Sequence, residues 1–290
     1  MVSNSGLLSS YHERIFRKAK EKTPFQPIFL IGCGRSGTTI LGNLLGTHRS
    51  IKFLNERRDL WHSAYPEFDI WSGKIQSPIL IAGKAEVDPS KSLKLINEFH
   101  KEQIKGRSLI LLEKLPINSF RLEFIDLVFP QAKYIYLQRN GLEVAQSIEK
   151  ISKQGRWYGS NNSKWGLIKE TMNEFGIPDQ KYSHFQQGLI EWRLSMEFSE
   201  SFFSKLTEEK FYRLSYESLV NEPSRELANI FTFLKLNFEQ KKLDKYSKTV
   251  QRKSRKLSFS DFHDLGSLGG KHLIRSIENT LTPPSTPGQS

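Results

Sequence analysis

Short apolar runs alternate along this chain with longer segments in which apolar residues recur every three or four positions. The runs are nearly continuous, which is typical of strands buried on both faces of a parallel sheet. Strands that alternate with helices are joined by right-handed crossovers. The pattern therefore predicts an α/β fold of three layers, with a central parallel sheet flanked by helices. The five predicted strands are residues 27–31, 51–54, 109–112, 134–137 and 211–214.

Helical patterns occupy the segments between these runs. Asp88 before Pro89 is typical of a helix start, because the carboxylate caps free N–H groups and the fixed φ of proline suits the first turn. Leu93, Ile96 and Phe99 are expected on one side of this helix. The apolar residues that mark the other helices are Ile40, Leu41, Leu44 and Leu45 after the first run, Phe120, Phe124, Ile125 and Val128 in another, and Leu219, Leu227, Ile230, Phe231 and Leu234 in a later helix with Pro223 near its start.

The composition limits the class of protein. A chain of 290 residues is long enough for one large α/β domain with its own core. Cys33 is the single cysteine, so neither a disulfide framework nor a multi-cysteine metal site can form. Lys and Arg outnumber Asp and Glu by 43 to 31, and the resulting net charge of +12 indicates an anionic partner without choosing one.

The two ends of the chain differ from its middle. Residues 1–24 form a basic lead-in, and residues 281–290 combine proline with Ser and Thr, which is typical of a disordered tail. We therefore expect a single domain over residues 25–280. No apolar run approaches the roughly 20 residues that cross a bilayer, and the first residues include no apolar signal segment. We expect a soluble, cytoplasmic protein without a membrane span.

The strongest chemical pattern follows the first predicted strand. The sequence GCGRSGTT at residues 32–39 places three glycines, one cation and three hydroxyls between a strand and a helix. Glycines allow a tight turn whose N–H groups point inward, and the helix N-terminus adds partial positive charge. This loop is therefore predicted to bind an anion and makes the fold P-loop-like. The expected ligands are Gly34, Arg35, Ser36, Gly37, Thr38 and Thr39.

Two nucleotide loops resemble this pattern only in part. A nucleoside-triphosphate loop has a lysine after its last glycine, where this chain has Thr38. A dinucleotide loop needs an acidic residue after the second strand, and Glu56 matches that only partly. A P-loop nucleotide kinase or NTPase stays an alternative.

A second cation follows the fourth predicted strand. Arg139 comes directly after that run, and Ser147 lies eight residues later, within the next helix. The planar guanidinium of arginine suits phosphate oxygens, and the hydroxyl of Ser147 can add a hydrogen bond. The alternative is that Arg139 pairs with a carboxylate such as Glu143 and that Ser147 is a plain surface residue.

The RSGTT loop, followed by an Arg and a Ser at this spacing, resembles the sulfotransferases that use 3′-phosphoadenosine 5′-phosphosulfate (PAPS). The Arg-type loop is similar to the bacterial and tyrosylprotein branch. Lys114-x-Pro116-x-Asn118 and the segment from Tyr216 to Val220 resemble two further motifs, so that the resemblance covers about residues 27–236. It implies that the loop binds the 5′-phosphosulfate, that Arg139 and Ser147 bind the 3′-phosphate, and that Tyr216 also contacts the nucleotide.

The resemblance implies transfer of a sulfuryl group from PAPS to a hydroxyl of a glycan, lipid, phenol or peptide tyrosine, leaving PAP. Glu56 matches the catalytic base of the tyrosylprotein branch, and Arg35 and Lys114 are the expected catalytic cations. His48 and His62 flank the same region and stay alternatives for the base. No histidine spacing is typical of a metal site, so we expect no metal.

The acceptor cannot be read from the sequence. The segments expected to select it include Trp61, Trp71, Trp157, Tyr158, Trp165 and Trp192, which suit a bound ring and equally suit packing. A homodimer stays open, and no nucleic acid is expected. In another class altogether, the chain would be a nucleic-acid or membrane binder on a degenerate nucleotide fold, acting through the basic residues 241–256. Within an enzyme, Ser254, Arg255 and Lys256 could instead close over the nucleotide.

Overall fold

The computed structural model describes residues 26–160, 162–247 and 268–272. A sheet of five parallel strands forms the centre of the fold, in the order β2-β3-β1-β4-β5. The predicted strands and the α/β class are confirmed, with ends that differ by up to two residues. The strands are β1 (Gln26–Ile31), β2 (Ile51–Asn55), β3 (Ile110–Lys114), β4 (Lys133–Gln138) and β5 (Phe211–Ser215).

The central strand β1 explains why its run is apolar without interruption. Ile28 and Leu30 face one core of buried side chains, whereas Phe29 and Ile31 face another on the opposite side of the sheet. Both faces are covered by helices, so successive residues are buried whichever way they point.

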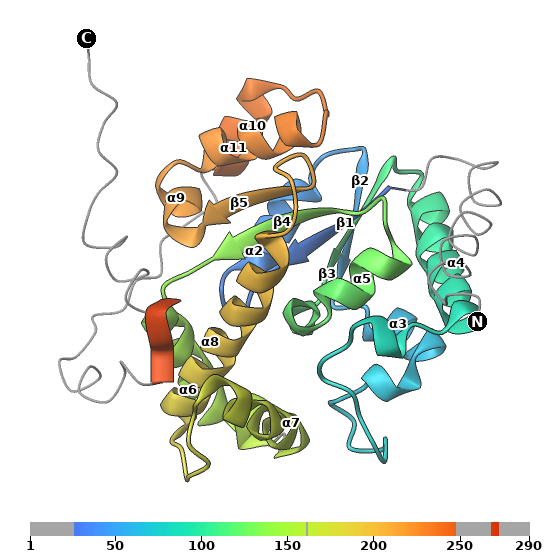
Figure 1. Cartoon of the computed structure of the whole chain (residues 1–290). Helices are drawn as coiled ribbons and strands as arrows, with labels where there is room; N and C mark the ends of the chain where they lie inside the picture. Colours follow the sequence, from blue (N-terminus) through green and yellow to red (C-terminus); the bar gives the residue numbers. More distant parts are fainter. Residues whose placement is uncertain (1–25, 161, 248–267, 273–290) are drawn as a thin grey trace.

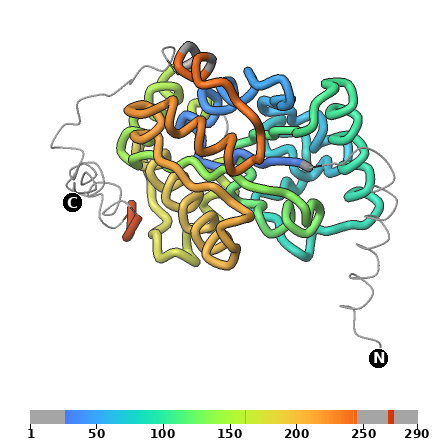
Figure 2. The backbone as a smooth tube through the Cα atoms, turned by 90° about the horizontal axis from the view of Figure 1, so that it is seen from above, coloured from blue at the N-terminus to red at the C-terminus, as the bar shows by residue number. Residues whose placement is uncertain are grey.

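Helices cover both faces of the sheet (Figure 1). One core includes side chains of α2 (Thr38–Leu45), α9 (Tyr216–Asn221), α10 (Pro223–Phe233) and α11 (Gln240–Ser247). In Figure 2, seen from above, α10 and α11 lie over the sheet. The other core includes α3 (Arg58–Ala64), α4 (Pro89–Gly106), α5 (Leu122–Val128), α6 (Gly141–Ser152), α7 (Asn162–Met172) and α8 (His184–Phe203). Short 3₁₀ turns are η1 (Pro66–Phe68), η2 (Lys84–Glu86), η3 (Pro116–Phe120), η4 (Trp157–Gly159) and η5 (Asn173–Phe175).

Three details of the helical prediction are wrong. Phe120 ends the turn η3, and α5 begins only at Leu122. Asp88 caps α4 as expected, by accepting a hydrogen bond from the backbone N–H of Lys91, but Leu93 is 42% exposed and Leu95 is buried instead. A spacing of three rotates steadily around a helix, so Leu93 and Phe99 cannot share one face. The single late helix is in fact two, because Pro223 forces the preceding Glu222 out of helical geometry.

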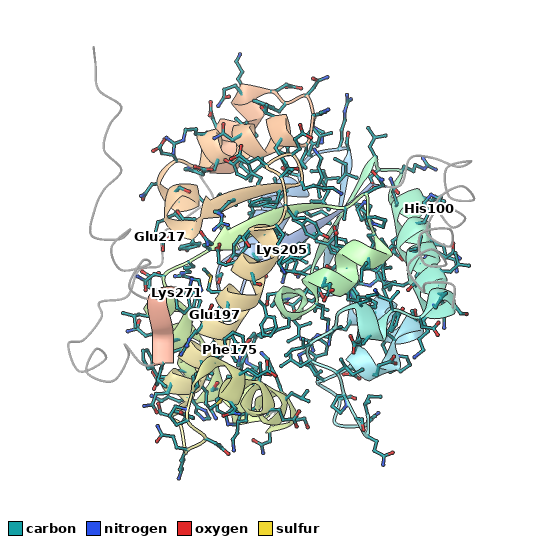
Figure 3. The ribbon with its side chains drawn as sticks, in the orientation of Figure 1. His100, Phe175, Glu197, Lys205, Glu217 and Lys271 are labelled. Atoms are coloured by element: carbon teal, nitrogen blue, oxygen red, sulfur yellow. The ribbon has the colours of Figure 1, made fainter. Side chains whose placement is uncertain are left out.

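Near the chain end, residues 268–272 pack against α8. His272 is buried, and its Nε2 lies 3.1 Å from Glu197, which is labelled in Figure 3. The lead-in 1–24, the tail 281–290, and Ser254, Arg255 and Lys256 lie outside the described residues. The single-domain prediction for residues 25–280 stays a prediction. Within the described part of the chain, no helix is long and apolar enough to cross a membrane.

Two glycines in helices test the closeness of this packing. A Cβ atom on Gly42 of α2 would come within 2.1 Å of the Phe53 ring of β2, whereas one on Gly166 of α7 would meet nothing within 4 Å. We expect Gly166→Ala to stabilise the fold by about 0.5–1 kcal/mol through helix propensity. Gly42→Ala is expected to destabilise it by about 1–3 kcal/mol through overpacking. Urea denaturation measures both, and equal stabilisation would contradict the contact between α2 and β2.

Candidate active site

A cavity of about 710 Å³ opens where the parallel strands end. The carboxyl edge of such a sheet is where ligands bind in open α/β folds, and the volume lies within the range of ligand pockets. Its walls come from the loop after β1, the residue after β2, the end of β3, the start of α9 and one face of α6. This main cavity is lined by Gly34, Arg35, Gly37, Thr38, Thr39, Ile40, Glu56, Lys114, Pro116, Arg139, Glu143, Gln146, Ser147, Lys150, Ile151, Gln154, Arg156, Trp157 and Tyr216.

The loop after β1 is shaped by left-handed backbone. Arg35 has φ 72° and Gly37 has φ 98°, and the N–H of Ser36 donates to the carbonyl of Cys33 at 3.1 Å. Glycine is required at residue 37 on steric grounds as well, because a Cβ atom there would lie 2.6 Å from the ring of Tyr216. α2 begins at the next residue, so the unpaired N–H groups of its first turn lie beside the cavity.

Positive charge dominates the walls. Three of the lining cations, Arg35, Lys114 and Arg139, are sequence-predicted, and the structure adds Lys150 and Arg156. Burial, together with the charges of Arg139 and Arg156, lowers the pKa of the Arg35 guanidinium. These five cations face two carboxylates, those of Glu56 and Glu143. An arrangement that crowds like charges in this way favours a polyanionic ligand.

Arg139 and Ser147 both line the cavity but do not bond to each other in the contacts that the structure gives. Nε of Arg35 donates to the Ser147 hydroxyl at 3.1 Å, and Arg139 donates through NH1 to the carbonyl of Arg35 at 3.0 Å. Arg139 also donates twice to Glu143 Oε2, at 3.0 and 2.7 Å, and stacks over the ring of Tyr216. The sequence leaves open that Arg139 pairs with Glu143, and the structure shows this ion pair. Both residues line the cavity, so the pair does not lie on a remote surface.

The start of α6 is tied to α9 through its backbone. The N–H of Asn140 donates to Glu217 Oε1 at 3.3 Å (Glu217 is labelled in Figure 3). The side chain of Asn140 caps α6 by accepting from the N–H groups of Leu142 and Glu143. These contacts fix the helix whose face supplies Ser147 and Lys150.

Glu56 and Lys114 form the central ion pair. Nζ of Lys114 donates to Glu56 Oε1 at 2.6 Å and to the hydroxyl of Thr39 at 2.9 Å. The Lys114 side chain is only 1% exposed, whereas Glu56 faces the cavity and has φ 53°. The N–H of Glu56 also donates to the carbonyl of Lys114 at 2.8 Å. The pair therefore joins the ends of β2 and β3 to the first turn of α2.

The charge of Glu56 is set by its neighbours. Burial alone would raise the pKa of this carboxyl, but the hydrogen bond and charge of Lys114, with the weaker contribution of Arg58, hold the pKa below its ordinary value. The carboxylate is therefore ionised at neutral pH and can accept a proton.

The two histidine alternatives lie away from this pair. His48 precedes the amino end of β2, whereas the cavity lies at the carboxyl ends of the strands. The N–H of Ser50 donates to Nδ1 of His48, whose Nε2 contacts the carbonyl of Asn237. His62 lies on α3 and lines a second cavity of about 390 Å³. This side cavity adjoins the main one through Arg58, which bonds to Glu56 and stacks on the ring of Trp71.

The structure sorts the six aromatic residues that could suit an acceptor. Trp157 lines the main cavity, and Trp71 lines the side cavity. Trp165 packs edge-on against Tyr158 and is not among the residues that line either cavity. Trp61 and Trp192 are almost fully buried, as is Tyr158, although Trp61 also borders the side cavity.

The sequence prediction missed two cations of the cavity, Lys150 on α6 and Arg156 beyond its end. Lys150 and Ile151 lie three and four residues after Ser147, so the three point to the same side of α6, and Gln154 follows just beyond the helix end. Helical periodicity counted from Ser147 could have found Lys150. Arg156 lies beyond the helix end, and no local pattern indicates it.

The donor set suits an anionic nucleotide better than a metal ion. Among the described residues, no group of three or more His, Cys, Asp or Glu side chains could hold a metal. The prediction that no metal is needed stays a prediction. The glycine loop, the first turn of α2 and the surrounding cations instead match the donors that phosphate groups require.

Comparison with known proteins identifies the family. Residues 27–240 match the Sulfotransferase family, and the chain therefore belongs to it, as its motifs predict. Protein-tyrosine sulfotransferase A of Caenorhabditis elegans is 24% identical over 233 residues, which cover 76% of this chain and 52% of that protein. An uncharacterised protein of Aquifex aeolicus is 25% identical over 241 residues, covering 76% and 27%. This chain thus spans about half or a quarter of the length of these relatives.

Solved structures of sulfotransferases share the fold. The sulfotransferase domain of the Synechococcus PCC 7002 olefin synthase has a TM-score of 0.53 at 17% identity, covering 91% of this chain and 97% of that one. A sulfotransferase from Mycobacterium avium has a TM-score of 0.52 at 13% identity, covering 93% and 80%. Likenesses at this identity define the architecture and leave the substrates open.

The Arg139–Glu143 pair generates a prediction about anion binding. An incoming phosphate must approach or displace the Glu143 carboxylate, so Glu143→Gln should tighten binding of adenosine 3′,5′-bisphosphate about three- to tenfold, or roughly 1 kcal/mol. Isothermal titration calorimetry measures this. Glu149→Gln is the matched control, since Glu149 pairs with Lys153 elsewhere on α6. Unchanged or weaker binding in Glu143→Gln would show that the carboxylate does not compete with the anion.

Proposed function

We propose that this chain transfers the sulfuryl group of PAPS to a hydroxyl of an acceptor by in-line displacement. The observation that supports this most is the shared cavity, in which a cationic phosphate loop and an ionised carboxylate meet at Lys114. A phosphate-binding site alone would suit many proteins. A base within the same cavity suits attack by a hydroxyl on a group bound in the loop.

The nucleotide is assigned to residues that line the cavity. Gly34, Arg35, Gly37, Thr38 and Thr39 would hold the 5′-phosphosulfate, Arg139 and Ser147 the 3′-phosphate, and Tyr216 would contact the nucleoside. Ser36, the remaining predicted ligand in the loop, is 1% exposed and is not among the residues that line the cavity. When bound, PAPS supplies the sulfuryl group and PAP is the product that remains. Lys150 and Arg156 add positive charge beside the same phosphates.

Three side chains divide the chemistry. Glu56 accepts the proton of the acceptor hydroxyl at its carboxylate, which Lys114 and Arg58 hold in the ionised form. Lys114 and Arg35 donate to the oxygens on which negative charge increases. Lys114 is only 1% exposed, so water screens its charge little, whereas Arg35 is an exposed residue of the loop. Thr39 fixes the ammonium of Lys114 at the helix start.

Phosphoryl transfer is the alternative reaction. Thr38 occupies the position of the lysine that contacts β- and γ-phosphates in nucleoside-triphosphate loops. Lys114 places an ammonium beside the loop from β3 instead, and family membership favours sulfuryl transfer. The class of acceptor, a homodimer, the absence of a nucleic-acid partner and a cytoplasmic location stay predictions. The basic residues 241–256 are described only as far as 247.

The identity of the base can be tested by the pH dependence of kcat/KM. The folded-state pKa of Glu56 is lowered, so the carboxylate stays ionised as the pH falls to below about 4.3, the ordinary value for glutamate. We therefore expect no acid limb from the base between pH 8 and about pH 5. A histidine base would halve kcat/KM near about pH 6.5, and a limb there would exclude Glu56.

Substitution of the base is the direct test of the transfer reaction. Glu56→Gln keeps the shape of the side chain but cannot accept a proton, so turnover with radiolabelled PAPS should fall by about 10²–10⁴-fold. Binding of PAP should change far less, since Glu56 contacts no phosphate in this assignment. Glu98→Gln, which alters a surface pair with Lys101, is the control. Turnover that survives Glu56→Gln would refute the assignment of the base.

A further inference from the structure

The wall of the main cavity includes one indole ring, that of Trp157. Trp157 touches the phosphate loop so closely that a Cβ atom on Gly34 would lie 2.5 Å from its ring. Pro116, just after Lys114, lies beside the same glycine. Trp157 and Pro116 therefore meet the same residue of the phosphate loop, and both line the main cavity.

A buried carboxylate fixes this ring from behind. Glu191 of α8 is 3% exposed and accepts three hydrogen bonds: from Nε1 of Trp157 at 2.9 Å, from Nζ of Lys164 at 2.6 Å, and from the hydroxyl of Tyr158. The ammonium of Lys164 also lies 4.1 Å from the centre of the Trp157 ring. Buried polar groups are costly when unpaired, so these three donors and their shared acceptor hold one another in place, and with them the indole.

The backbone at Trp157 is also strained. Trp157 has φ 52°, a left-handed conformation that is rare for a bulky side chain. Gly155 is also left-handed, and Gly159 packs so tightly on α6 that a Cβ atom would come within 2.1 Å of the Ser152 carbonyl. A strained conformation of this kind persists only where surrounding contacts hold it in place. Such conformations are frequent at functional sites.

The network determines what the ring can offer to a ligand. Its N–H is bonded to Glu191 and one face is covered by the ammonium of Lys164, so the indole presents carbon to the cavity. The phosphates of a nucleotide need the cations on the other walls. A flat carbon surface instead matches an aromatic ring, since such rings stack with a gain beyond simple burial.

We propose that Trp157 determines acceptor specificity, that Glu191 and Lys164 are its positioning residues, and that the acceptor hydroxyl belongs to a flat aromatic ring. This inference rests on the proposed sulfotransferase function and names the acceptor class of the same site. The base supports it independently. Because the pKa of Glu56 is lowered, the carboxylate is a weak base, better matched to an acidic phenol than to an aliphatic hydroxyl.

Phenol and cyclohexanol are a matched pair of acceptors, alike in size but different in flatness. We expect the wild-type protein to prefer phenol in kcat/KM. Trp157→Leu should lower the ratio of phenol to cyclohexanol by about tenfold or more, while the Kd of PAP changes less than about twofold. The two hydroxyls differ in acidity equally for both proteins, so the change in the ratio reports the ring contact alone.

Further variants separate specificity from folding. Trp165→Leu is the control, expected to leave the ratio unchanged, because Trp165 does not line the cavity. Trp157→Phe keeps a flat ring and should retain much of the phenol preference even where Trp157→Leu lowers the thermal stability. Glu191→Gln should raise the KM for phenol more than it lowers kcat, with the Kd of PAP unchanged, as expected for a positioning residue.

The possible negative results distinguish the proposed function from the inference about the acceptor. A wild-type protein that does not bind PAP contradicts the proposed function and is detected before any variant is measured. A wild-type protein that binds PAP and transfers sulfate but does not prefer phenol overturns the inference alone. An unchanged ratio in Trp157→Leu also overturns it, as does a loss of PAP affinity in this variant, which would place the ring against the nucleotide.

Discussion

The ion pair between Lys114 and Glu56 is the contact on which the site depends. An ammonium buried at the end of β3 must be paired, because an isolated charge out of water is very costly. Its partners are the first residue after β2 and the first turn of α2, so one lysine holds three separate segments together. The same contact keeps the carboxylate ionised and places positive charge beside the phosphate loop.

The position of Lys114 also explains how the loop after β1 can lack the lysine of a nucleoside-triphosphate loop. Thr38 lies where a nucleoside-triphosphate loop has its cation, and the hydroxyl of the next residue instead binds the ammonium of Lys114. β3 and β1 are paired in the sheet, so a cation on one strand end is in reach of the loop on the other. In a parallel sheet, residues far apart in sequence converge at one edge, and chemistry can be divided between them.

Much of this could be predicted from the sequence, because the relevant signals are local. Strand ends follow from continuous apolar runs, the loop from its glycines, and Arg139 and Ser147 from a spacing within one strand–helix unit. The missed features are tertiary. Trp157 and Glu191 meet only because α6, η4 and α8 pack together. Glu143 was foreseen as a partner of Arg139, yet no sequence pattern could place that pair inside the cavity. Leu93 shows the same limit within one helix, where a plausible spacing gave the wrong face.

The central claim is that the cavity at the strand ends binds a 3′-phosphorylated nucleotide for sulfuryl transfer. Calorimetric titration of the protein with adenosine 3′,5′-bisphosphate, 5′-AMP and ATP with magnesium tests it most directly. The account predicts tight binding of the bisphosphate, with affinity lost in Arg139→Ala, and much weaker binding of 5′-AMP, which lacks the 3′-phosphate. A preference for ATP with magnesium, or equal affinity for 5′-AMP and the bisphosphate, would contradict it.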